Sequence, residues 1–478
     1  MKKLNLVALV FLLLAVNVNA QDGVHQQSTV YEWPADQKVK AKLDKWEDQK
    51  FGMLIHWGLY AVPGIIESWE LNSESWIERD STIAYEDYKK WYWGLSKTFY
   101  PSKFNPDQWA KAGKDAGMKY MIFTTKHHDG FAMFDTKQSD FNIASGPFKA
   151  NPKADVTKYV FESFRKQGFM IGAYFSKPDW HSQYFWWSKY ATPDRNTNYD
   201  IRKHPWRWNQ FKQFSFNQLS ELMHNYGAID ILWLDGGWVR PLETVNDEVR
   251  SWGAAIPEWS QDIDMPKISG MAREAQPGLL MVDRTVHGPY ENYQTPEQKI
   301  PEKQLDHPWE SCLTLGNAWG FVANDKYKQP DEVIRSLVEV VAKGGSLLLG
   351  VGPRPDGTFP EVAVSRLEQI GKWMKVNGKA IYGTRITADY HNGNTWFTQS
   401  KDQLVKNAVY CFKPDHNLPS IIEWEGNLPK KGSKMILLNG SRIVKWELNG
   451  NTVKVYLPKT LKNSPDVYGA LAFSYPVK

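Results

Sequence analysis

The sequence predicts an α/β fold: a (β/α)8-like TIM barrel followed by a C-terminal antiparallel β-sandwich. Strand-like and helix-like patterns alternate from about residue 50, which is typical of a parallel sheet with crossover helices. Polar residues stand at the ends of the strand-like runs, where a barrel carries its active face. After about residue 385, helical periodicity gives way to short alternating runs. An open doubly wound sheet is the alternative, but no glycine-rich dinucleotide turn follows the first strand.

Six apolar runs are expected to form barrel strands, because each is short and closes on polar residues or glycine. They span residues 51–55, 120–125, 169–175, 231–235, 279–282 and 346–351. Amphipathic segments between and after these runs predict the covering helices. These helices are expected at 106–116, 156–166, 206–225, 332–342 and 361–376.

The C-terminal part of the chain predicts a separate antiparallel domain. Short alternating runs lie at 408–412, 435–438, 444–448, 453–457 and 470–475. The dipeptide Asn449-Gly450 separates two of them, which is a strong hairpin signal. We therefore divide the chain into a signal peptide at 1–20, a barrel domain at 21–384 and a β-sandwich domain at 385–478.

Residues 1–20 have the pattern of a secretory signal peptide. Lys2 and Lys3 precede an apolar run too short to span a bilayer, and Val18 and Ala20 are spaced for cleavage. We therefore expect an exported protein, either periplasmic or secreted, with no membrane span elsewhere in the chain.

Composition argues against several classes of partner. The net charge of +5 is spread along the chain without a basic stripe, which makes nucleic acid a poor partner. The only two cysteines, Cys312 and Cys411, are expected to be buried thiols rather than a disulfide. The chain has 23 Trp, 22 Tyr and 22 Phe, and many of these aromatic residues fall in expected loops. That placement favours a stacking surface as well as a core.

Asp235 is the most informative candidate for chemistry. An apolar run ends in this carboxylate, and Gly236, Gly237 and Trp238 follow it. At the carboxyl end of a barrel strand such a side chain points into the site; the alternative is an Asp that caps the next turn. The other expected strand ends and the loops after them supply further candidates: His56, His127, His128, Asp129, Tyr174, Arg284, Glu291, Glu297 and Glu310.

Paired carboxylates fit this set of residues best. Glycoside hydrolysis needs two acids across the scissile bond, and a strand-end Asp with a Glu from a later loop meets that need. No Gly-x-Ser-x-Gly elbow supports a serine nucleophile. A metal site is the alternative, but His127 and His128 are adjacent and share one metal only if the strand has already ended.

Four motifs resemble the α-L-fucosidases of glycoside hydrolase family 29. They are FGMLIHWG at 51–58, TTKHHDGF at 124–131, WLDGGW at 233–238 and GGSLLLGVGP at 344–353. The resemblance runs in consistent order from about residue 45 to 385. It implies a retaining exo-α-L-fucosidase that acts through a covalent fucosyl-Asp intermediate and needs no cofactor or metal. The partner it implies is a fucosylated oligosaccharide or glycoconjugate.

The resemblance also assigns roles to residues. The nucleophile falls on Asp235, and the acid/base falls on Glu297, with Glu291 and Glu310 as rivals. Residues that contact the sugar are implied at His56, Trp69, His127, His128, Tyr174, Trp233, Arg284 and Trp319. Two other functions stay open at this point: a non-catalytic protein that binds fucosylated glycans, and a metal-dependent barrel hydrolase.

Overall fold

The computed structural model describes residues 28, 30–74, 76–253, 255–413, 418–459, 461 and 467–477. The signal peptide expected at 1–20 lies outside the described residues. Within this part of the chain, no helix combines the length and the apolar character needed to cross a membrane.

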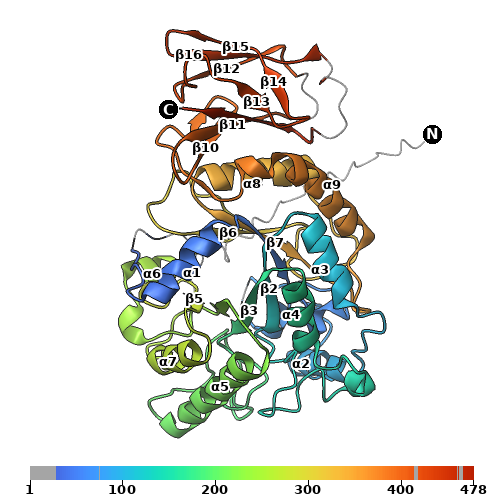
Figure 1. Cartoon of the computed structure of the whole chain (residues 1–478). Helices are drawn as coiled ribbons and strands as arrows, with labels where there is room; N and C mark the ends of the chain where they lie inside the picture. Colours follow the sequence, from blue (N-terminus) through green and yellow to red (C-terminus); the bar gives the residue numbers. More distant parts are fainter. Residues whose placement is uncertain are drawn as a thin grey trace, which may run out of the picture.

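The centre of the molecule is a curled sheet of parallel strands (Figure 1), in the order β5-β4-β3-β2-β1-β7-β6. The strands are β1 Phe51–Ile55, β2 Tyr120–Lys126, β3 Met170–Ser176, β4 Ile231–Asp235, β5 Leu280–Asp283, β6 Glu310–Thr314 and β7 Ser346–Val351. Every pairing between neighbours is parallel. The predicted barrel architecture is confirmed, and β6 is the strand that sequence analysis missed.

The two edge strands, β5 and β6, are joined by an irregular segment at 290–298. Its first part bridges to β5 through Val282 and Glu291. Its second part bridges to the β6 side, Gln294 to Trp309 and Glu297 to Cys312. This segment therefore takes the place of an eighth strand and carries Glu297 to the rim of the barrel.

Helices surround the sheet (Figure 1). They are α1 Gln37–Glu47, α2 Tyr85–Gly94, α3 Pro106–Asp115, α4 Val156–Lys166, α5 Pro205–Asn225, α6 Asp247–Ser251, α7 Met265–Ala275, α8 Pro330–Ala342 and α9 Glu361–Asn377. The five expected helices are confirmed to within two residues at each end. The sequence patterns did not predict α1, α2, α6 or α7.

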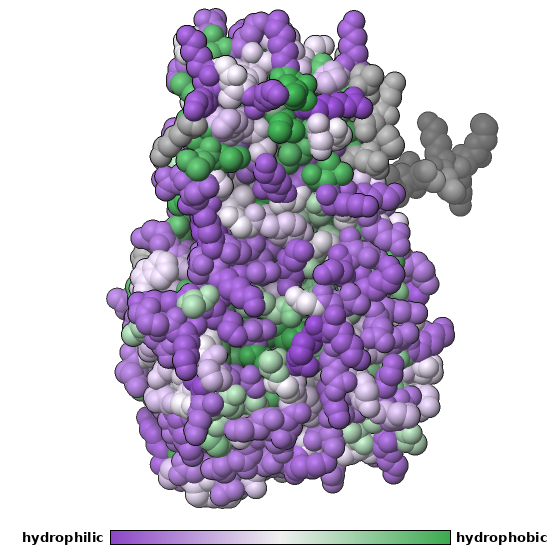
Figure 2. All heavy atoms as spheres, viewed as in Figure 1, coloured by the Kyte–Doolittle hydropathy of each residue, from purple (hydrophilic) through white to green (hydrophobic). Residues whose placement is uncertain are grey.

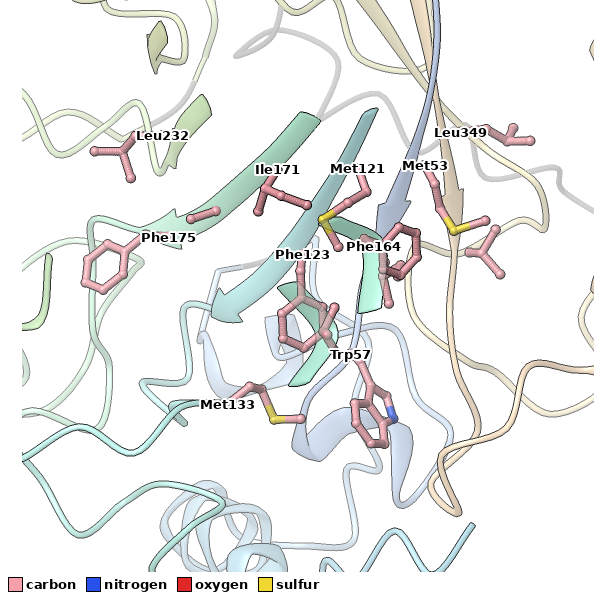
Figure 3. Close-up of a cluster of buried hydrophobic side chains, with 14 of the residues drawn as sticks. Met53, Trp57, Met121, Phe123, Met133, Phe164, Ile171, Phe175, Leu232 and Leu349 are labelled. Atoms are coloured by element: carbon pink, nitrogen blue, oxygen red, sulfur yellow. The ribbon is translucent and has the colours of Figure 1, made fainter. Parts of the chain in front are cut away.

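Alternation along the strands creates two apolar layers. One set of side chains faces outward, among them Met53, Met121, Ile171 and Leu232, and packs with helix residues such as Phe164 of α4 (Figure 3). The alternate set fills the interior of the barrel and includes Leu54, Ile122, Tyr174, Trp233 and Val282. This second set decides which strand-end side chains reach the site.

The C-terminal strands form two antiparallel sheets. They are β8 Thr384–Arg385, β9 His391–Asn392, β10 Thr395–Ser400, β11 Val405–Cys411, β12 Ile421–Glu425, β13 Met435–Leu437, β14 Arg442–Val444, β15 Trp446–Asn449, β16 Thr452–Tyr456 and β17 Ala470–Pro476. One sheet has the order β14-β13-β17-β11-β10-β8, with β9 on β10, and the other has the order β12-β16-β15. Phe397, Trp424 and Phe473 from both sheets share one core, which confirms the predicted sandwich. The Asn449-Gly450 hairpin is also confirmed, because Asn449 pairs with Thr452.

The sandwich packs on the barrel over α8 (Figure 1). The Trp373 indole of α9 donates to the carbonyl of Ala470 at 2.9 Å. Cys312 and Cys411 are both free and buried, as expected. The visible surface is largely hydrophilic, with several hydrophobic residues gathered over the C-terminal strands (Figure 2). The domain boundaries at 20/21 and 384/385 stay predictions.

Candidate active site

A pocket opens at the carboxyl ends of the barrel strands and encloses about 420 Å³, its mouth included. All ten residues predicted to be catalytic or to bind the sugar line it, together with Leu54, Glu67 and Trp238. The ten are His56, Trp69, His127, His128, Tyr174, Trp233, Asp235, Arg284, Glu297 and Trp319. No residue of the β-sandwich is among the lining residues.

The strand alternation explains why Asp235 points into this pocket. Ile231 and Trp233 of β4 face the barrel interior, so Asp235, two residues further, faces the same way. The same step of two residues follows Leu54 on β1 and Val282 on β5. It places His56 and Arg284 in the pocket wall.

Arg284 is the centre of the charged group in the pocket. Its Nη1 donates to Oδ1 of Asp235 at 2.8 Å, and its Nη2 donates to Oε2 of Glu297 at 2.8 Å. The guanidinium also lies 4.2 Å from the centroid of the Trp233 ring. Burial by itself lowers the pKa of Arg284, but the charges of Asp235 and Glu297 outweigh it and hold the pKa above its usual value. One cation therefore fixes both carboxylates side by side.

The other oxygen of Asp235 has its own partners. Tyr174 donates its hydroxyl to Oδ2 at 2.7 Å, and Nε2 of His128 lies 3.8 Å from the same oxygen. Burial, followed by the charge of Asp235, raises the pKa of Tyr174 well above its usual value, so the phenol stays a donor. Asp235 is only 8% exposed, which leaves its carboxylate directed by fixed donors rather than by water.

Each pocket histidine is held through its Nδ1 atom by a hydroxyl group. His56 contacts Tyr60 and His127 contacts Ser68, both at 2.7 Å, and His128 contacts Ser176. These contacts leave Nε2 of His56 and of His127 for a ligand, whereas Nε2 of His128 also faces Asp235. The sequence patterns predicted none of the three hydroxyl residues. Of the three, only Tyr60 lies near its histidine in the sequence, four residues after His56.

The three imidazoles are neutral near pH 7. Burial lowers the pKa of His56 and of His127 well below 6.5, and in each case a neighbouring imidazole adds to the effect. Burial lowers the pKa of His128 to about 3, even though Asp235 acts against it. Neutral rings both donate and accept hydrogen bonds, which suits sugar hydroxyls.

His127 and His128 both reach the pocket because β2 has ended before them. The strand stops at Lys126 after an irregularity in its register. The turn that follows brings the two ring centroids to 4.2 Å from each other. Gly130 closes this turn with a φ of +81°, and a Cβ there would lie 2.1 Å from Asp179. The strand has therefore ended before the two adjacent histidines, and the turn lets both face the same pocket.

The rivals of Glu297 lie elsewhere. Glu291 accepts from the Thr285 backbone and contacts His287 at 2.6 Å, outside the pocket lining. Glu310 stands at the start of β6, not at its end, so it lies inside the barrel. There it accepts from Tyr120 at 2.7 Å and from Trp233 at 3.2 Å. Glu297 alone of the three lines the pocket with Asp235.

Glu67 is the pocket carboxyl that sequence analysis did not assign. It is 2% exposed and has a positive φ of 40°. Its Oε1 accepts the backbone N–H groups of Trp319 and Gly320, both at 2.9 Å. Burial raises the pKa of Glu67 to about 7. Glu74, which also stands two residues before a tryptophan, pairs with Arg195 at 2.6 Å outside the pocket lining.

Aromatic rings build one wall of the pocket. Trp69 lies edge-on to His128 and to Trp180, with centroids 5.0 Å and 5.6 Å apart. The Trp238 ring packs with its centroid 5.8 Å from that of Trp69.

Within the described residues, no group of three or more His, Cys, Asp or Glu side chains is arranged to hold a metal ion.

Comparison of the chain with known proteins identifies its family. The α-L-fucosidase family model matches residues 18–379. The chain belongs to the α-L-fucosidase family. It is therefore a glycoside hydrolase of the kind that the four motifs resemble.

Known α-L-fucosidases align with nearly the whole length of this chain. Plasma α-L-fucosidase of Homo sapiens is 28% identical and aligns with 91% of this chain and 90% of its own. The structure of α-L-fucosidase isoenzyme 1 from Paenibacillus thiaminolyticus is 28% identical, with a TM-score of 0.73 over 92% of this chain and all of its own. A Thermotoga maritima α-fucosidase, solved with a mechanism-based inhibitor, is 25% identical, with a TM-score of 0.69 over 94% and 100%.

Proposed function

We propose that the protein is an exo-acting α-L-fucosidase that hydrolyses terminal α-L-fucosyl residues with retention of configuration. The observation that carries this proposal is the pair of carboxylates, Asp235 and Glu297, held by one guanidinium in the wall of one pocket. A retaining enzyme needs two carboxyl groups about 5–5.5 Å apart, and Arg284 brings Asp235 and Glu297 together in one wall of the pocket. Leu54 and Trp233 of the barrel interior also line the pocket, and we infer that they close it below the sugar, as an enzyme acting on a terminal residue requires.

In the first step, an oxygen of Asp235 attacks the anomeric carbon, and Glu297 gives a proton to the glycosidic oxygen. The bond between the anomeric carbon and that oxygen breaks, and the leaving group departs as an alcohol. The product is a fucosyl ester on Asp235. Arg284 and Tyr174 orient the attacking carboxylate, and neutral Nε2 atoms of the histidines bind the fucose hydroxyls.

In the second step, the Glu297 carboxylate takes a proton from water, and the water oxygen attacks the anomeric carbon. The ester bond to Asp235 breaks, fucose leaves with its original configuration, and Glu297 is protonated again. In this structure Arg284 and Trp319 both donate to Glu297, so donors already occupy its carboxyl group. We infer that the contact between Glu297 and Arg284 opens when a glycan enters.

Glu67 is the competing acid. Its pKa of about 7 is suited to a proton donor near neutral pH. Its Oε1, however, is already occupied by two backbone N–H groups, which tie it to the loop at 319–320. Glu297 accepts from the side chains of Arg284 and Trp319, and side chains can rearrange.

Azide rescue tests both assignments. With an aryl α-L-fucoside, Asp235→Gly is expected to lose about 10⁴-fold in kcat, as loss of a catalytic carboxylate does, and azide is expected to restore turnover as a fucosyl azide of inverted configuration. Glu297→Ala with azide is expected to give the retained azide. If Glu67→Ala gives the retained azide and Glu297→Ala does not, Glu67 is the acid. A folded Asp235→Gly protein that azide cannot rescue contradicts the nucleophile.

The residues of the pocket and two activity measurements also distinguish the proposed function from the two other functions. A protein that only binds fucosylated glycans has no need for two carboxylates on one arginine, and it releases no fucose. A metal-dependent hydrolase loses activity with a chelator, whereas we expect no activity to be lost.

We also propose that the enzyme meets its glycans outside the cytoplasm, because of the signal-peptide pattern at 1–20. Cell fractionation tests this location: protein that stays in the cytoplasm with residues 1–20 still attached contradicts it.

A further inference from the structure

We propose that Arg195 is a positioning residue of the enzyme, which fixes the aromatic wall of the pocket without itself lining it. This inference rests on the proposed function. The wall tryptophans, Trp69 and Trp238, both line the pocket, whereas Arg195 is not among the lining residues. Arg195 is 2% exposed and lies between β3 and α5, in the segment at 177–204.

The guanidinium of Arg195 contacts both wall tryptophans. Its central carbon lies 5.1 Å from the centroid of the Trp69 ring and 5.1 Å from that of the Trp238 ring. A cation is attracted to an aromatic ring, and the attraction is stronger where the cation is buried away from water. One buried charge therefore holds both rings of the wall.

Glu74 fixes the orientation of this guanidinium. Nε of Arg195 donates to Oε1 of Glu74 at 2.7 Å, and Nη2 donates to Oε2 at 2.6 Å. Burial by itself raises the pKa of Glu74, but Arg195 outweighs it and holds the pKa below its usual value, so the carboxylate is charged. A bidentate pair of this kind fixes the plane of the guanidinium as well as its position. The wall tryptophans therefore pack against a cation of fixed orientation.

Three loops meet at Arg195. Trp69 and Glu74 follow β1, Arg195 itself follows β3, and Trp238 follows β4. The Trp180 indole, which packs against Trp69, donates to the carbonyl of Arg195 at 3.1 Å. The wall is therefore assembled from separate loops, and loss of the Arg195 side chain removes a contact that these loops share.

The wall contacts the part of the site that holds the sugar. Trp69 and Trp238 both lie edge-on to His128, with ring centroids 5.0 Å from that of the imidazole in each case. Because these rings pack against the sugar and take no part in breaking the bond, they stabilise the bound substrate and the transition state alike. We therefore expect Arg195 to affect the affinity for the sugar more than kcat.

Substitution of Arg195 tests this role through the affinity for L-fucose. Arg195→Met removes the charge and leaves Glu74 without that partner. The double variant Arg195→Met/Glu74→Gln removes both charges and takes the place of the single variant if that one does not fold. We expect either variant to raise KM for an aryl fucoside and the inhibition constant of L-fucose about tenfold, with kcat within about threefold of the wild type. Arg195→Lys keeps the charge but not the planar face, so we expect a rise of about threefold in both constants.

Arg207→Met is the matched control. Arg207 is 7% exposed, and its guanidinium carbon lies 3.9 Å from the centroid of the Trp187 ring and 4.9 Å from that of the Trp206 ring. Neither ring is among those that line the pocket. We expect this variant to have a lower melting temperature, because it loses the same kind of contact, but unchanged KM and an unchanged inhibition constant. A loss of folded enzyme lowers the measured kcat and leaves both constants as they are, so the two effects are distinguishable.

A double-mutant cycle shows whether Arg195 acts through the wall. Trp238→Leu removes one of the two rings and is expected to raise the inhibition constant of L-fucose by itself. If Arg195 acts through this ring, adding Arg195→Met to Trp238→Leu should raise the constant only about threefold, less than in the wild-type background. Effects that multiply in full contradict an action through the wall.

The outcomes separate this inference from the proposed function. If the wild type does not hydrolyse the aryl fucoside, the proposed function is wrong. If the wild type does so and the folded Arg195 variants bind L-fucose as tightly as it does, the function stands and Arg195 does not position the wall. An equal rise in both constants in Arg207→Met also contradicts the inference, because the effect is then a general result of lost packing.

Discussion

Arg284 joins the two carboxylates on which the proposed chemistry depends, and it is itself 2% exposed. Its planar fork gives one nitrogen to Asp235 and the other to Glu297. Removing a partner from a buried ion pair leaves an uncompensated charge, which costs more than the pair itself contributes. Here two carboxylates lose their partner at once.

Substitution of Arg284 should therefore affect both stability and rate. Arg284→Met is expected to lower the free energy of unfolding by about 3–5 kcal/mol. Arg284→Lys keeps a charge but loses the fork, so we expect it to recover part of the stability while kcat/KM stays at least about 100-fold down. Urea unfolding and aryl fucoside kinetics measure the two effects. A Lys variant with wild-type kinetics would show that the bridging geometry is unimportant.

Glu310 gives the interior of the barrel a pH-dependent stability. Burial raises the pKa of its carboxyl to about 7 from an ordinary value of 4.5. The folded state therefore keeps a proton that the unfolded state has lost. The stability from this group is fully present below pH 4.5 and is lost as the pH rises through 7.

Glu310→Gln removes this titration and keeps hydrogen bonds to Tyr120 and Trp233. Between pH 4.5 and 8 the wild type is expected to lose up to about 3 kcal/mol of unfolding free energy relative to the variant. Urea unfolding of both proteins across this range measures the difference. Parallel curves contradict a raised pKa at Glu310.

At the residue scale, the sequence predicts the orientation of side chains that continue a strand. Asp235 and Arg284 follow interior residues by two positions, so alternation alone places them in the pocket. Glu67 and Ser68 lie in an irregular loop, where no period exists to orient them. Their positions depend on contacts with Trp319 and His127, which are far away in the sequence.

At the element scale, the closing of the barrel positions Glu297. The segment at 290–298 bridges β5 and β6 without forming a regular strand. Its sequence has neither a period of two nor a helical period, so the sequence could not predict that it closes the sheet. Regular elements such as α4 and β1, in contrast, match the prediction residue for residue.

Glycines in β7 and its loop allow the Trp319 loop to lie close to the sheet. A Cβ on Gly350 would lie 2.7 Å from Cε3 of Trp319, and a Cβ on Gly352 would lie 2.3 Å from the backbone of Gly320. Contacts this short force a neighbour to move. The late-barrel motif therefore supports Glu297 indirectly, through Trp319.

Gly350→Ala should displace the Trp319 ring and weaken its hydrogen bond to Glu297. We expect a loss of about 1–3 kcal/mol in stability and about tenfold in kcat. Gly270→Ala in α7 is the control, because nothing lies within 4 Å of the added methyl group. It is expected to gain about 0.5–1 kcal/mol with unchanged kinetics. Full activity in the Gly350→Ala variant would show that Trp319 does not position Glu297.

At the scale of the whole molecule, the barrel and the sandwich share apolar packing. Val409, Cys411, Ala470 and Ala472 of β11 and β17 belong to the same buried cluster as the helices around the barrel. The pocket takes its lining from residues 54–319 alone. The sandwich therefore stabilises the barrel without contacting the site.

A charge at this shared core should destabilise the enzyme without altering its site. Val409→Asp buries an unpaired carboxylate and is expected to cost at least about 3 kcal/mol. Ile443→Asp on β14 is the control, because Ile443 is 62% exposed and should change little. Thermal melting compares the two, and KM measured well below the melting temperature should match the wild type. A changed KM in folded Val409→Asp contradicts the separation of roles.

The central step of the proposed reaction is the formation of a covalent bond between fucose and Asp235. Incubation with 2-fluoro-fucosyl fluoride should trap the ester, because the fluorine slows its hydrolysis more than its formation. Digestion and mass spectrometry then locate the label. We predict a single labelled peptide that carries the sugar on Asp235. A label on Glu297, on Glu67 or on any other residue would contradict the account.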